Sequence, residues 1–281
     1  MTSINQKELR FTSPTLTQRI RGMLGVDFYR LFHTPLFYIF LAIAAIIPAM
    51  VSAMTTMAGP TGEAVQMYSN VWQIIAATES LYVINTIADY ANMNMVFIFG
   101  GIMVSIFIGH DYSSGYVKQL FTAHAKKQDY MISKTLVCAF AMACMCGTYL
   151  VGGTVGGLLA GYDTTVNVGS LPVAILGKAV MSLGWASLYT FLNVVFRRYF
   201  GISIASSFFF GTGILIIGAA AVIENLALPT EMLNLFLYGA SVNANLAAGF
   251  EDLLICIAVS VAWALIYNTA GTLVLNRCDV Y

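Results

Sequence analysis

The sequence has few charged residues. Only 9% of its 281 residues are Asp, Glu, Lys or Arg, and the basic and acidic side chains are equal in number, 13 of each. Soluble domains carry about a quarter charged residues, so an ordinary soluble domain is excluded. The charge balance excludes a nucleic-acid-binding protein, which needs a basic face. Disorder is excluded as well, because it requires low hydrophobicity and high net charge.

The sequence also lacks the patterns of common catalytic and cofactor sites. Its five cysteines and three histidines show no metal-ligand or disulfide spacing, and neither HExxH nor GxSxG occurs. The glycine-rich stretch 152–157 lacks the GK[ST] ending of a phosphate-binding loop. Its small residues at helical spacing instead match close helix packing in lipid. We therefore expect no enzymatic activity, no metal and no cofactor in this chain.

Hydrophobic residues, by contrast, make up 59% of the chain and gather in runs long enough to cross a bilayer as helices. This pattern predicts an all-α polytopic membrane protein with a single transmembrane domain over residues 36–275. Cytoplasmic segments are expected at 1–35 and 276–281. The six predicted spans lie near 36–57, 91–109, 135–160, 172–196, 201–223 and 253–275.

The positions of Lys and Arg predict the orientation. The predicted loops 58–90, 161–171 and 224–252 contain no Lys or Arg, whereas every basic residue except Lys178 lies on the other side of the six spans. Cytoplasmic loops of membrane proteins are enriched in Lys and Arg. We therefore expect both termini to be cytoplasmic and the protein to lie in the plasma membrane, in contact with membrane lipids.

The segment before the first span has the pattern of an interfacial helix. Its apolar residues recur at helical spacing beside several arginines. Asp27 falls inside this apolar stripe, where an unpaired carboxylate is costly. Two interpretations remain open for it: a local pair with Arg30, or a contact with a cationic side chain of a partner subunit.

The two longest loops on the predicted outer side also contain apolar residues. We expect one or two helices on the outer leaflet within 58–90, because structureless loops of that length are uncommon. The apolar run near 226–237 is too short to cross the bilayer and predicts a re-entrant or interfacial helix.

A few residues within the spans could contact a transported molecule. Lys178 is the one charge inside a predicted span. It could reach the outer headgroups, pair with an acid such as Asp163, or face a translocation path. Asn193 could hydrogen-bond between helices or line the path. Of Phe208, Phe209 and Phe210, at least one ring must face a neighbouring helix, whereas lipid contact explains the other two.

The predicted cytoplasmic loop 110–134 contains a short amphipathic helix. Val117, Leu120, Phe121 and His124 share one face at i,i+3/i+4 spacing, and a basic segment follows. Such a helix suits docking into a groove on a cytoplasmic partner. A solvated amphipathic helix explains the same pattern.

Here the sequence resembles the permease subunits of ABC-2 type ATP-binding-cassette transporters, whose second span is followed by roughly [ED]-x3-G-T-[IL]-[KR]-x-L and then a basic cluster. The corresponding residues are Asp111, Gly115, Val117, Lys118, Leu120, Lys126, Lys127 and Lys134. Asp111 replaces the commoner Glu, and Tyr116 replaces the usual Thr. Residues 27–32, Asp-Phe-Tyr-Arg-Leu-Phe, and the tail 276–280 are similar to permeases of bacteriocin and lantibiotic export or immunity.

This resemblance implies a type V exporter-like fold and a mechanism. Two permeases, identical or homologous, would pair above two cytoplasmic ATPase subunits that bind ATP and Mg²⁺. Residues 113–124 would contain the coupling helix. Closure of the ATPase dimer would press on the face formed by Val117, Leu120 and Phe121. Polar contacts with the ATPase would come from Lys118, Lys126 and Lys127. On this basis Leu120→Asp or Phe121→Asp should abolish substrate-stimulated ATPase activity. Spans one, two and five would line the path.

The implied substrate is a hydrophobic or amphipathic molecule, such as a bacteriocin or lantibiotic peptide of a bacterial cell. Export of drugs, lipids or ions by the same kind of permease remains an alternative. An ion-coupled secondary transporter should show intramembrane acidic or histidine residues and an inverted repeat, neither of which is visible. A membrane enzyme would need an ionisable cluster, and a purely structural subunit remains open.

Overall fold

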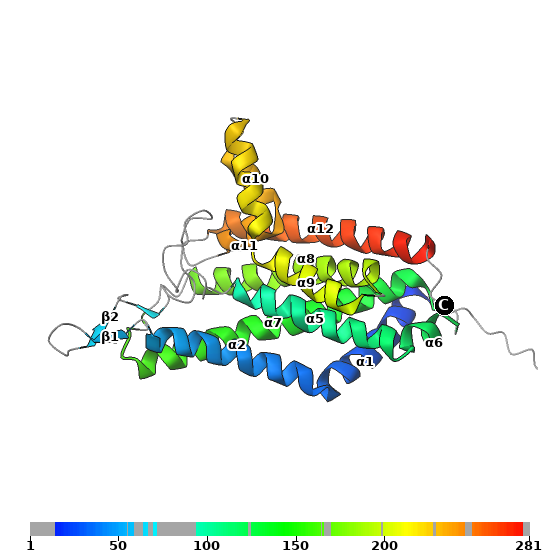
Figure 1. Ribbon diagram of the computed structural model, residues 1–281, viewed down its shortest axis with the longest axis horizontal. Coiled ribbons are helices and arrows are strands. Elements are labelled where there is room, and N and C mark those ends of the chain that lie inside the picture. The colour runs from blue at the N-terminus through cyan, green and yellow to red at the C-terminus, as the bar shows by residue number, and fades with distance from the viewer. Residues whose placement is uncertain are drawn as a thin grey trace, which may run out of the picture.

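The computed structural model describes residues 15–54, 56–58, 64–66, 70–71, 94–122, 125–163, 165, 170–197, 199–226, 229–244 and 249–277. In this part the chain is helical, apart from a hairpin of two three-residue strands (Figure 1). The elements are α1 Leu16–His33, α2 Pro35–Met54, β1 Thr56–Ala58, β2 Ala64–Gln66, α5 Met95–Ser113, α6 Tyr116–Thr122, α7 Lys127–Leu159, α8 Ser170–Val195, α9 Phe200–Gly211, α10 Ile214–Asn225, the 3-10 helix η1 Thr230–Leu235, α11 Leu237–Asn243 and α12 Phe250–Arg277.

Four of these helices are each long and apolar enough to cross a membrane: α5, α7, α8 and α12. Two bent pairs pass the same test together, namely α1 with α2, which meet at 65°, and α9 with α10, which meet at 53°. The described residues therefore contain four to six candidate spans. The six predicted spans are the upper end of this range.

Small residues allow close packing of the helices at positions predicted from the glycine-rich stretch 152–157. α2 packs along α7, and α8 packs along α12. A Cβ on Gly152 or Gly156 of α7 would collide with the backbone of Ala45 or Ala49 of α2. These two glycines therefore let the helix backbones approach closely, as expected where packing rather than the hydrophobic effect drives helix association.

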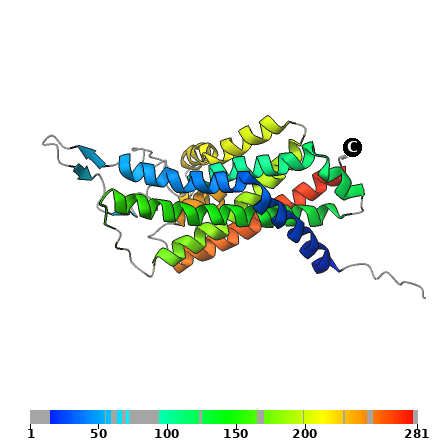
Figure 2. The same ribbon diagram turned by 90° about the horizontal axis from the view of Figure 1, so that it is seen from below.

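The helix expected before the first span is present as α1. Its N-terminus carries a capping box between Thr15 and Gln18, and the chain turns at Thr34, which is extended, before α2 starts at Pro35. Proline suits the first helical position because its missing N–H would be unpaired there anyway. α1, α6 and the last turn of α12 lie at the same end of the bundle (Figure 2).

The fifth predicted span is not one straight helix. It is broken at Thr212 and Gly213, and Gly213 has a φ of +74°, a conformation in which other residues are strained. α9 runs along the bundle, whereas α10 projects away from it (Figure 1). The predicted span over 201–223 therefore corresponds to two helices with a break, which pass the length and composition test for a span only as a pair.

The loops differ in part from the predictions. The first loop begins with the β1–β2 hairpin rather than a helix, and the helices expected farther along, within 72–93, lie outside the described residues. The short apolar run near 226–237 forms η1 and leads into α11, in which Leu237, Gly239, Ala240 and Ser241 are buried. Short helices therefore form here, while their re-entrant or interfacial position stays a prediction.

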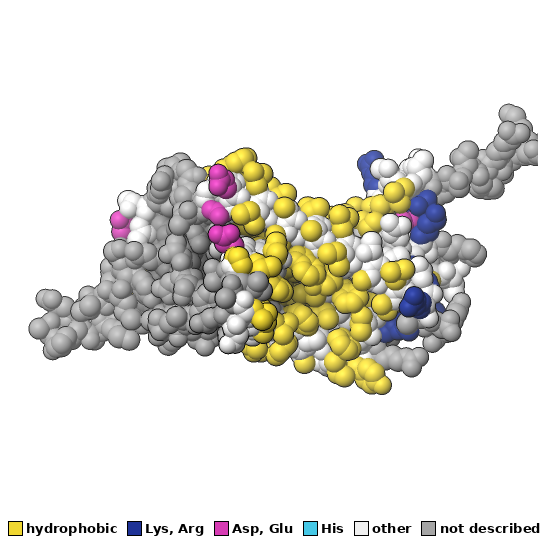
Figure 3. Space-filling view, turned by 90° about the horizontal axis from the view of Figure 1, so that it is seen from above, with side chains coloured by type: hydrophobic (Ala, Val, Ile, Leu, Met, Phe, Trp, Pro, Cys, Tyr) yellow, Lys and Arg dark blue, Asp and Glu magenta, His cyan; other side chains and the backbone are white. Residues whose placement is uncertain are grey.

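The predicted loop 110–134 is largely helical. α5 continues to Ser113, α6 begins at Tyr116 and α7 begins at Lys127. The predicted span boundaries were placed where the apolar runs end. The helices extend beyond them because polar residues such as Asp111 and Lys134 are also helical. On the face drawn in Figure 3, Lys and Arg gather at one end of an apolar belt, and Asp and Glu gather mostly at the other.

Candidate functional site

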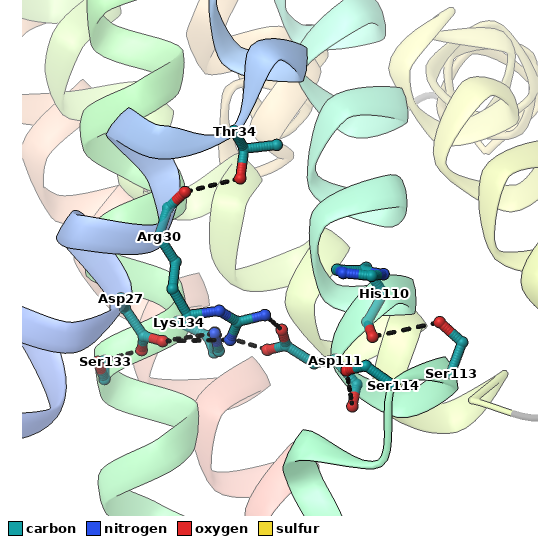
Figure 4. Close-up of polar contacts among 9 residues, drawn as sticks. All are labelled: Asp27, Arg30, Thr34, His110, Asp111, Ser113, Ser114, Ser133 and Lys134. Atoms are coloured by element: carbon teal, nitrogen blue, oxygen red, sulfur yellow. Dashed lines mark hydrogen bonds and ion pairs between the residues drawn. The ribbon is translucent and has the colours of Figure 1, made fainter.

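Four charged side chains from three helices meet at the basic end of the bundle. Asp27 and Arg30 come from α1, Asp111 from the end of α5, and Lys134 from the start of α7 (Figure 4). Asp27, Asp111 and Lys134 are fully buried, and the side chain of Arg30 is 23% exposed. We call these four residues the charge cluster.

The charge cluster is neutral and closely paired. The Lys134 ammonium lies 2.6 Å from a carboxylate oxygen of Asp27 and 2.6 Å from one of Asp111. Arg30 donates to the other oxygen of Asp111, and Ser133 donates a 2.7 Å hydrogen bond to the second oxygen of Asp27. Buried ions are tolerated when they are paired, and each of the four charges has an ion-pair partner, although Arg30 Nη1 has no hydrogen-bond partner.

Aromatic rings cover the two cations. The guanidinium of Arg30 lies 4.2 Å from the ring centre of Tyr116, and the ammonium of Lys134 lies 4.8 Å from that of Phe107. Burial and the Asp27 carboxylate raise the pKa of Tyr116, so its phenol stays protonated. Burial lowers the pKa of Arg30, but Asp111 more than offsets this and raises it overall, so the cation persists. Tyr116 therefore connects α6 to the charge cluster.

The turn between α5 and α6 depends on one glycine. Gly115 has a φ of +73°, and a Cβ there would meet nothing within 4 Å. The requirement is thus for the left-handed backbone conformation and not for space. Ser113 and Ser114 each donate to a carbonyl three residues back, which closes the end of α5.

The apolar side of α6 faces the protein interior. Val117 is buried, and Leu120 and Phe121 pack with it against Tyr130, Met131, Val194 and Leu275. The sequence-based hypothesis placed Val117, Leu120 and Phe121 on a face open to a partner, and the structure differs because α7, α8 and α12 already cover that face. Leu120→Asp or Phe121→Asp would therefore disturb the chain's own packing. His124 lies outside the described residues.

The side of α6 that remains exposed is polar. Lys118, Gln119 and Thr122 point outward, and Lys126 is exposed just before α7. We call these four residues the outer face of α6. Lys118, Gln119 and Thr122 are the exposed residues of α6, whereas Tyr116, Leu120 and Phe121 are half-buried.

Two further contacts tie the same end together. Arg19 of α1 forms a 2.7 Å ion pair with Asp129, which lies in the first turn of α7. Lys127 donates to the carbonyl of Leu275 near the end of α12, so it faces this chain rather than a partner. α1, α5, α6, α7 and α12 are thus linked by polar contacts at one end of the bundle.

The structure settles the open question about Asp27. Its closest cation is Lys134 of the same chain, whereas Arg30 is 4.0 Å away. The predicted local pair with Arg30 is therefore present but secondary. A cation from a partner subunit is not needed to balance this carboxylate.

Lys178 adopts neither of the two arrangements predicted for it on the outer side, and its role in a translocation path stays a prediction. It is buried, donates a 2.6 Å hydrogen bond to the side-chain oxygen of Asn94, and donates to the carbonyl of Ser241 in α11. It therefore neither extends to the headgroups nor pairs with Asp163. It links α8 to the start of α5 and to α11.

The other candidate path residues divide into packing and surface positions. Asn193 bonds Ser105 of α5 and Ser203 of α9, so it joins three helices. Phe210 packs against the core, whereas Phe208 and Phe209 are exposed on α9. This matches the expectation that one ring faces a neighbour and two face outward.

Several contributors to this end of the molecule were not found from the sequence. Tyr116 was noted only as a departure from the usual Thr, and neither Arg19 nor Asp129 was singled out. A signal existed for Tyr116, since an aromatic residue between charged segments suits a cation–π contact. No local pattern joins Arg19 to Asp129.

Comparison with known protein families assigns the chain to a family. Residues 24–221, more than two-thirds of its length, match the family described as ABC-2 family transporter protein. The matched region contains the whole charge cluster and α6. A search of curated proteins found no match. The chain therefore belongs to the ABC-2 transporter family.

Proposed function

We propose that the chain is the membrane-spanning permease subunit of an ATP-binding-cassette exporter and that separate ATPase subunits drive it through α6. Family membership makes the chain a membrane transport subunit. It also favours ATP-driven export over ion-coupled secondary transport, an enzyme or a purely structural role. ATP and Mg²⁺ would bind on the partner subunits.

The observation that carries this proposal is the attachment of α6 to the charge cluster. Tyr116 lies against Arg30, and Asp111 at the end of α5 is paired with residues of α1 and α7. Separating buried ion pairs leaves uncompensated charges and costs about 3–5 kcal/mol. A force that an ATPase subunit exerts on α6 would therefore move α1, α5 and α7 together, because the ion pairs of the charge cluster hold these helices to one another.

The outer face of α6 is the proposed ATPase contact. It replaces the apolar face of Val117, Leu120 and Phe121, which packs on the chain itself. Lys118 and Lys126 make the outer face basic, which suits a partner groove lined with acidic side chains. Gln119 and Thr122 lie between them.

The orientation and assembly follow the same proposal. The end that holds the charge cluster also holds α6 and the last turn of α12, with the exposed Lys118, Lys126 and Arg277, and would face the cytoplasm, with both termini on that side. Two ATPase subunits would dock under a pair of permeases, either two copies of this chain or this chain with a homologous one. The pair would lie in the plasma membrane of a bacterial cell.

The proposed substrate is hydrophobic or amphipathic, with a bacteriocin or lantibiotic peptide as the leading candidate. α2, α5 and α9 would line its path between the two permeases. Phe208 and Phe209, exposed on α9, would supply an apolar surface for such a molecule. A lantibiotic should then stimulate the ATPase activity of the complex, and stimulation only by a drug, a lipid or an ion would replace the peptide assignment.

Site-specific cross-linking tests the ATPase contact. With Cys278→Ser as background, we expect a cysteine placed by Gln119→Cys to cross-link to a Walker-motif ATPase in native membranes. Glu251→Cys is the control, because Glu251 is exposed in the first turn of α12, at the opposite end of that helix from Arg277. Cross-linking from Glu251→Cys alone would contradict both the contact and the orientation.

A further inference from the structure

A cleft lies beside the charge cluster, between the end of α5 and the start of α9. Its volume is about 460 Å³, within the range of small-ligand sites. The lining residues are Ile106, Gly109, His110, Tyr112, Ser113, Asn193, Phe196, Arg197, Phe200 and Ser203. Arg197 is the one residue among them that is charged at neutral pH, and no carboxylate lines the cleft.

Arg197 has an unfilled hydrogen-bonding position. Its Nη1 atom is buried and has no hydrogen-bond partner, and Arg197 forms no ion pair within the described part of the chain. Asp111, which lies on the neighbouring turn of α5, is occupied by Arg30 and Lys134 (Figure 4). A half-buried cation is costly without a counter-charge, so the Arg197 guanidinium at the wall of this cleft suits an anion from outside the chain.

The polar neighbours do not supply that anion. Ser203 donates to the side-chain oxygen of Asn193, and Asn193 donates in turn to Ser105 and to the carbonyl of Tyr189. Ser113 donates to the carbonyl of His110. The cleft thus presents a cation to any ligand and no negative charge.

The rim of the cleft is suited to a membrane surface. Tyr199, Phe200 and Ile202 follow Arg197 at the start of α9 and are exposed, with 62%, 46% and 48% of their surfaces accessible. Aromatic side chains gather where the bilayer core meets the headgroups, and arginine binds phosphate oxygens well. Apolar contacts for acyl chains therefore lie beside a donor for the headgroup.

We propose that this cleft binds the phosphate of a membrane phospholipid, with the Arg197 guanidinium as donor and the acyl chains over Phe200 and Ile202. The site is independent of ATPase docking, since α6 contributes no residue to it. A lipid held there would bridge α5 and α9, the two helices that form its walls.

Lipid binding to the full-length, detergent-purified and delipidated chain tests the proposal. The probes are dioleoylphosphatidylglycerol and dioleoylglycerol, which share acyl chains and differ in the phosphate headgroup, and retention is measured by native mass spectrometry. We expect the phosphatidyl lipid to bind at least about tenfold more tightly, the factor given by one charge-assisted hydrogen bond. Arg197→Gln should remove this preference, and Arg197→Lys should keep part of it.

Two variants control the measurement. Arg21→Gln removes an exposed arginine of α1 and should leave binding unchanged. Gly109→Leu fills the cleft from the α5 wall, since a Cβ there already collides with the Phe200 ring, and should weaken binding without removing a charge. If Arg197→Gln fails to fold, weaker binding of dioleoylphosphatidylglycerol to Gly109→Leu supports the proposal, and unchanged binding contradicts it.

Three results would overturn the proposal. Equal binding of the two lipids would exclude phosphate recognition. Displacement of the lipid by millimolar inorganic phosphate would make the site one for the free anion. If Arg197→Gln instead altered the oligomeric state and left lipid binding unchanged, the partner of Arg197 would be a carboxylate of a second copy.

Discussion

Two buried lysines on neighbouring helices, Lys134 of α7 and Lys178 of α8, are held in different ways. Lys134 contacts the carboxylates of Asp27 and Asp111, which with Arg30 make a neutral group. Lys178 contacts an amide oxygen of Asn94 and a backbone carbonyl of Ser241, and it forms no ion pair with any described residue. One lysine is thus neutralised and the other is only solvated by dipoles.

The difference indicates which end of the bundle is rigid. At the Lys134 end, separation of the helices would expose unpaired charges to a medium of low dielectric constant, so α1, α5 and α7 should stay together. At the Lys178 end, α11 is attached by neutral acceptors that other dipoles can replace. We therefore expect rearrangements during transport to occur at the α11 end and to be transmitted through the charge cluster end.

The largest effect in this comparison should come from Lys134→Met. The change leaves Asp27 and Asp111 buried with only the partly exposed Arg30 to balance them. We expect a loss of about 3–5 kcal/mol in the free energy of unfolding, or failure to fold. Unfolding of the purified protein in mixed detergent micelles measures it.

The double variant Lys134→Met/Asp27→Asn is the matched control for that loss. It removes one cation and one carboxylate together, so it should recover a substantial part of the lost stability. A double variant as unstable as the sum of the two single variants would show that Lys134 acts through packing and not through its ion pair.

Lys178→Met should have a smaller effect on the same scale. Removal of this ammonium leaves two neutral acceptors without a donor, a cost of about 1–3 kcal/mol, but it also removes the desolvation cost of a buried charge. The net change in unfolding free energy should be about 2 kcal/mol smaller than for Lys134→Met, the difference between the midpoints of the two ranges. Equal losses in the two variants would remove the distinction between the two ends.

Tyr116→Leu should have the smallest effect on stability. The leucine keeps apolar contact but loses the cation–π interaction with Arg30, which is worth about 0.5–2 kcal/mol. Because Tyr116 joins α6 to the charge cluster, Tyr116→Leu should remove a large fraction of the permease-dependent stimulation of ATP hydrolysis. Its effect on the free energy of unfolding should be small. Tyr116→Phe, which keeps the ring, should behave as the unsubstituted chain in both measurements.

Much of the architecture followed from the sequence because hydropathy and charge act locally. The apolar runs located α2, α5, α7, α8 and α12, and the apolar stripe beside several arginines located α1. The break in the fifth span was missed because residues 200–225 are almost continuously apolar, and Gly213 is compatible with either a helix or a turn in lipid.

The site was predictable only in part. The loop motif pointed to Asp111, Gly115 and Lys134, but the pair of Asp27 with Lys134 joins residues 107 positions apart, and no periodicity reports such a contact. The amphipathic pattern of α6 was correct, yet an apolar face can pack on its own chain as well as on a partner. Which of the two occurs depends on tertiary packing against residues such as Tyr130 and Leu275.

The charge cluster is proposed to transmit ATPase movement from α6 to α1, α5 and α7. The most direct test of this transmission compares Arg30→Gln with Arg21→Gln in the ATPase–permease complex reconstituted in lipid vesicles. Arg30 is partly exposed and joins α1 to Asp111, whereas Arg21 lies exposed on the same helix. We predict that Arg30→Gln loses most of the permease-dependent stimulation of ATP hydrolysis while the complex stays assembled, and that Arg21→Gln keeps it. Equal stimulation in both variants would contradict the claim.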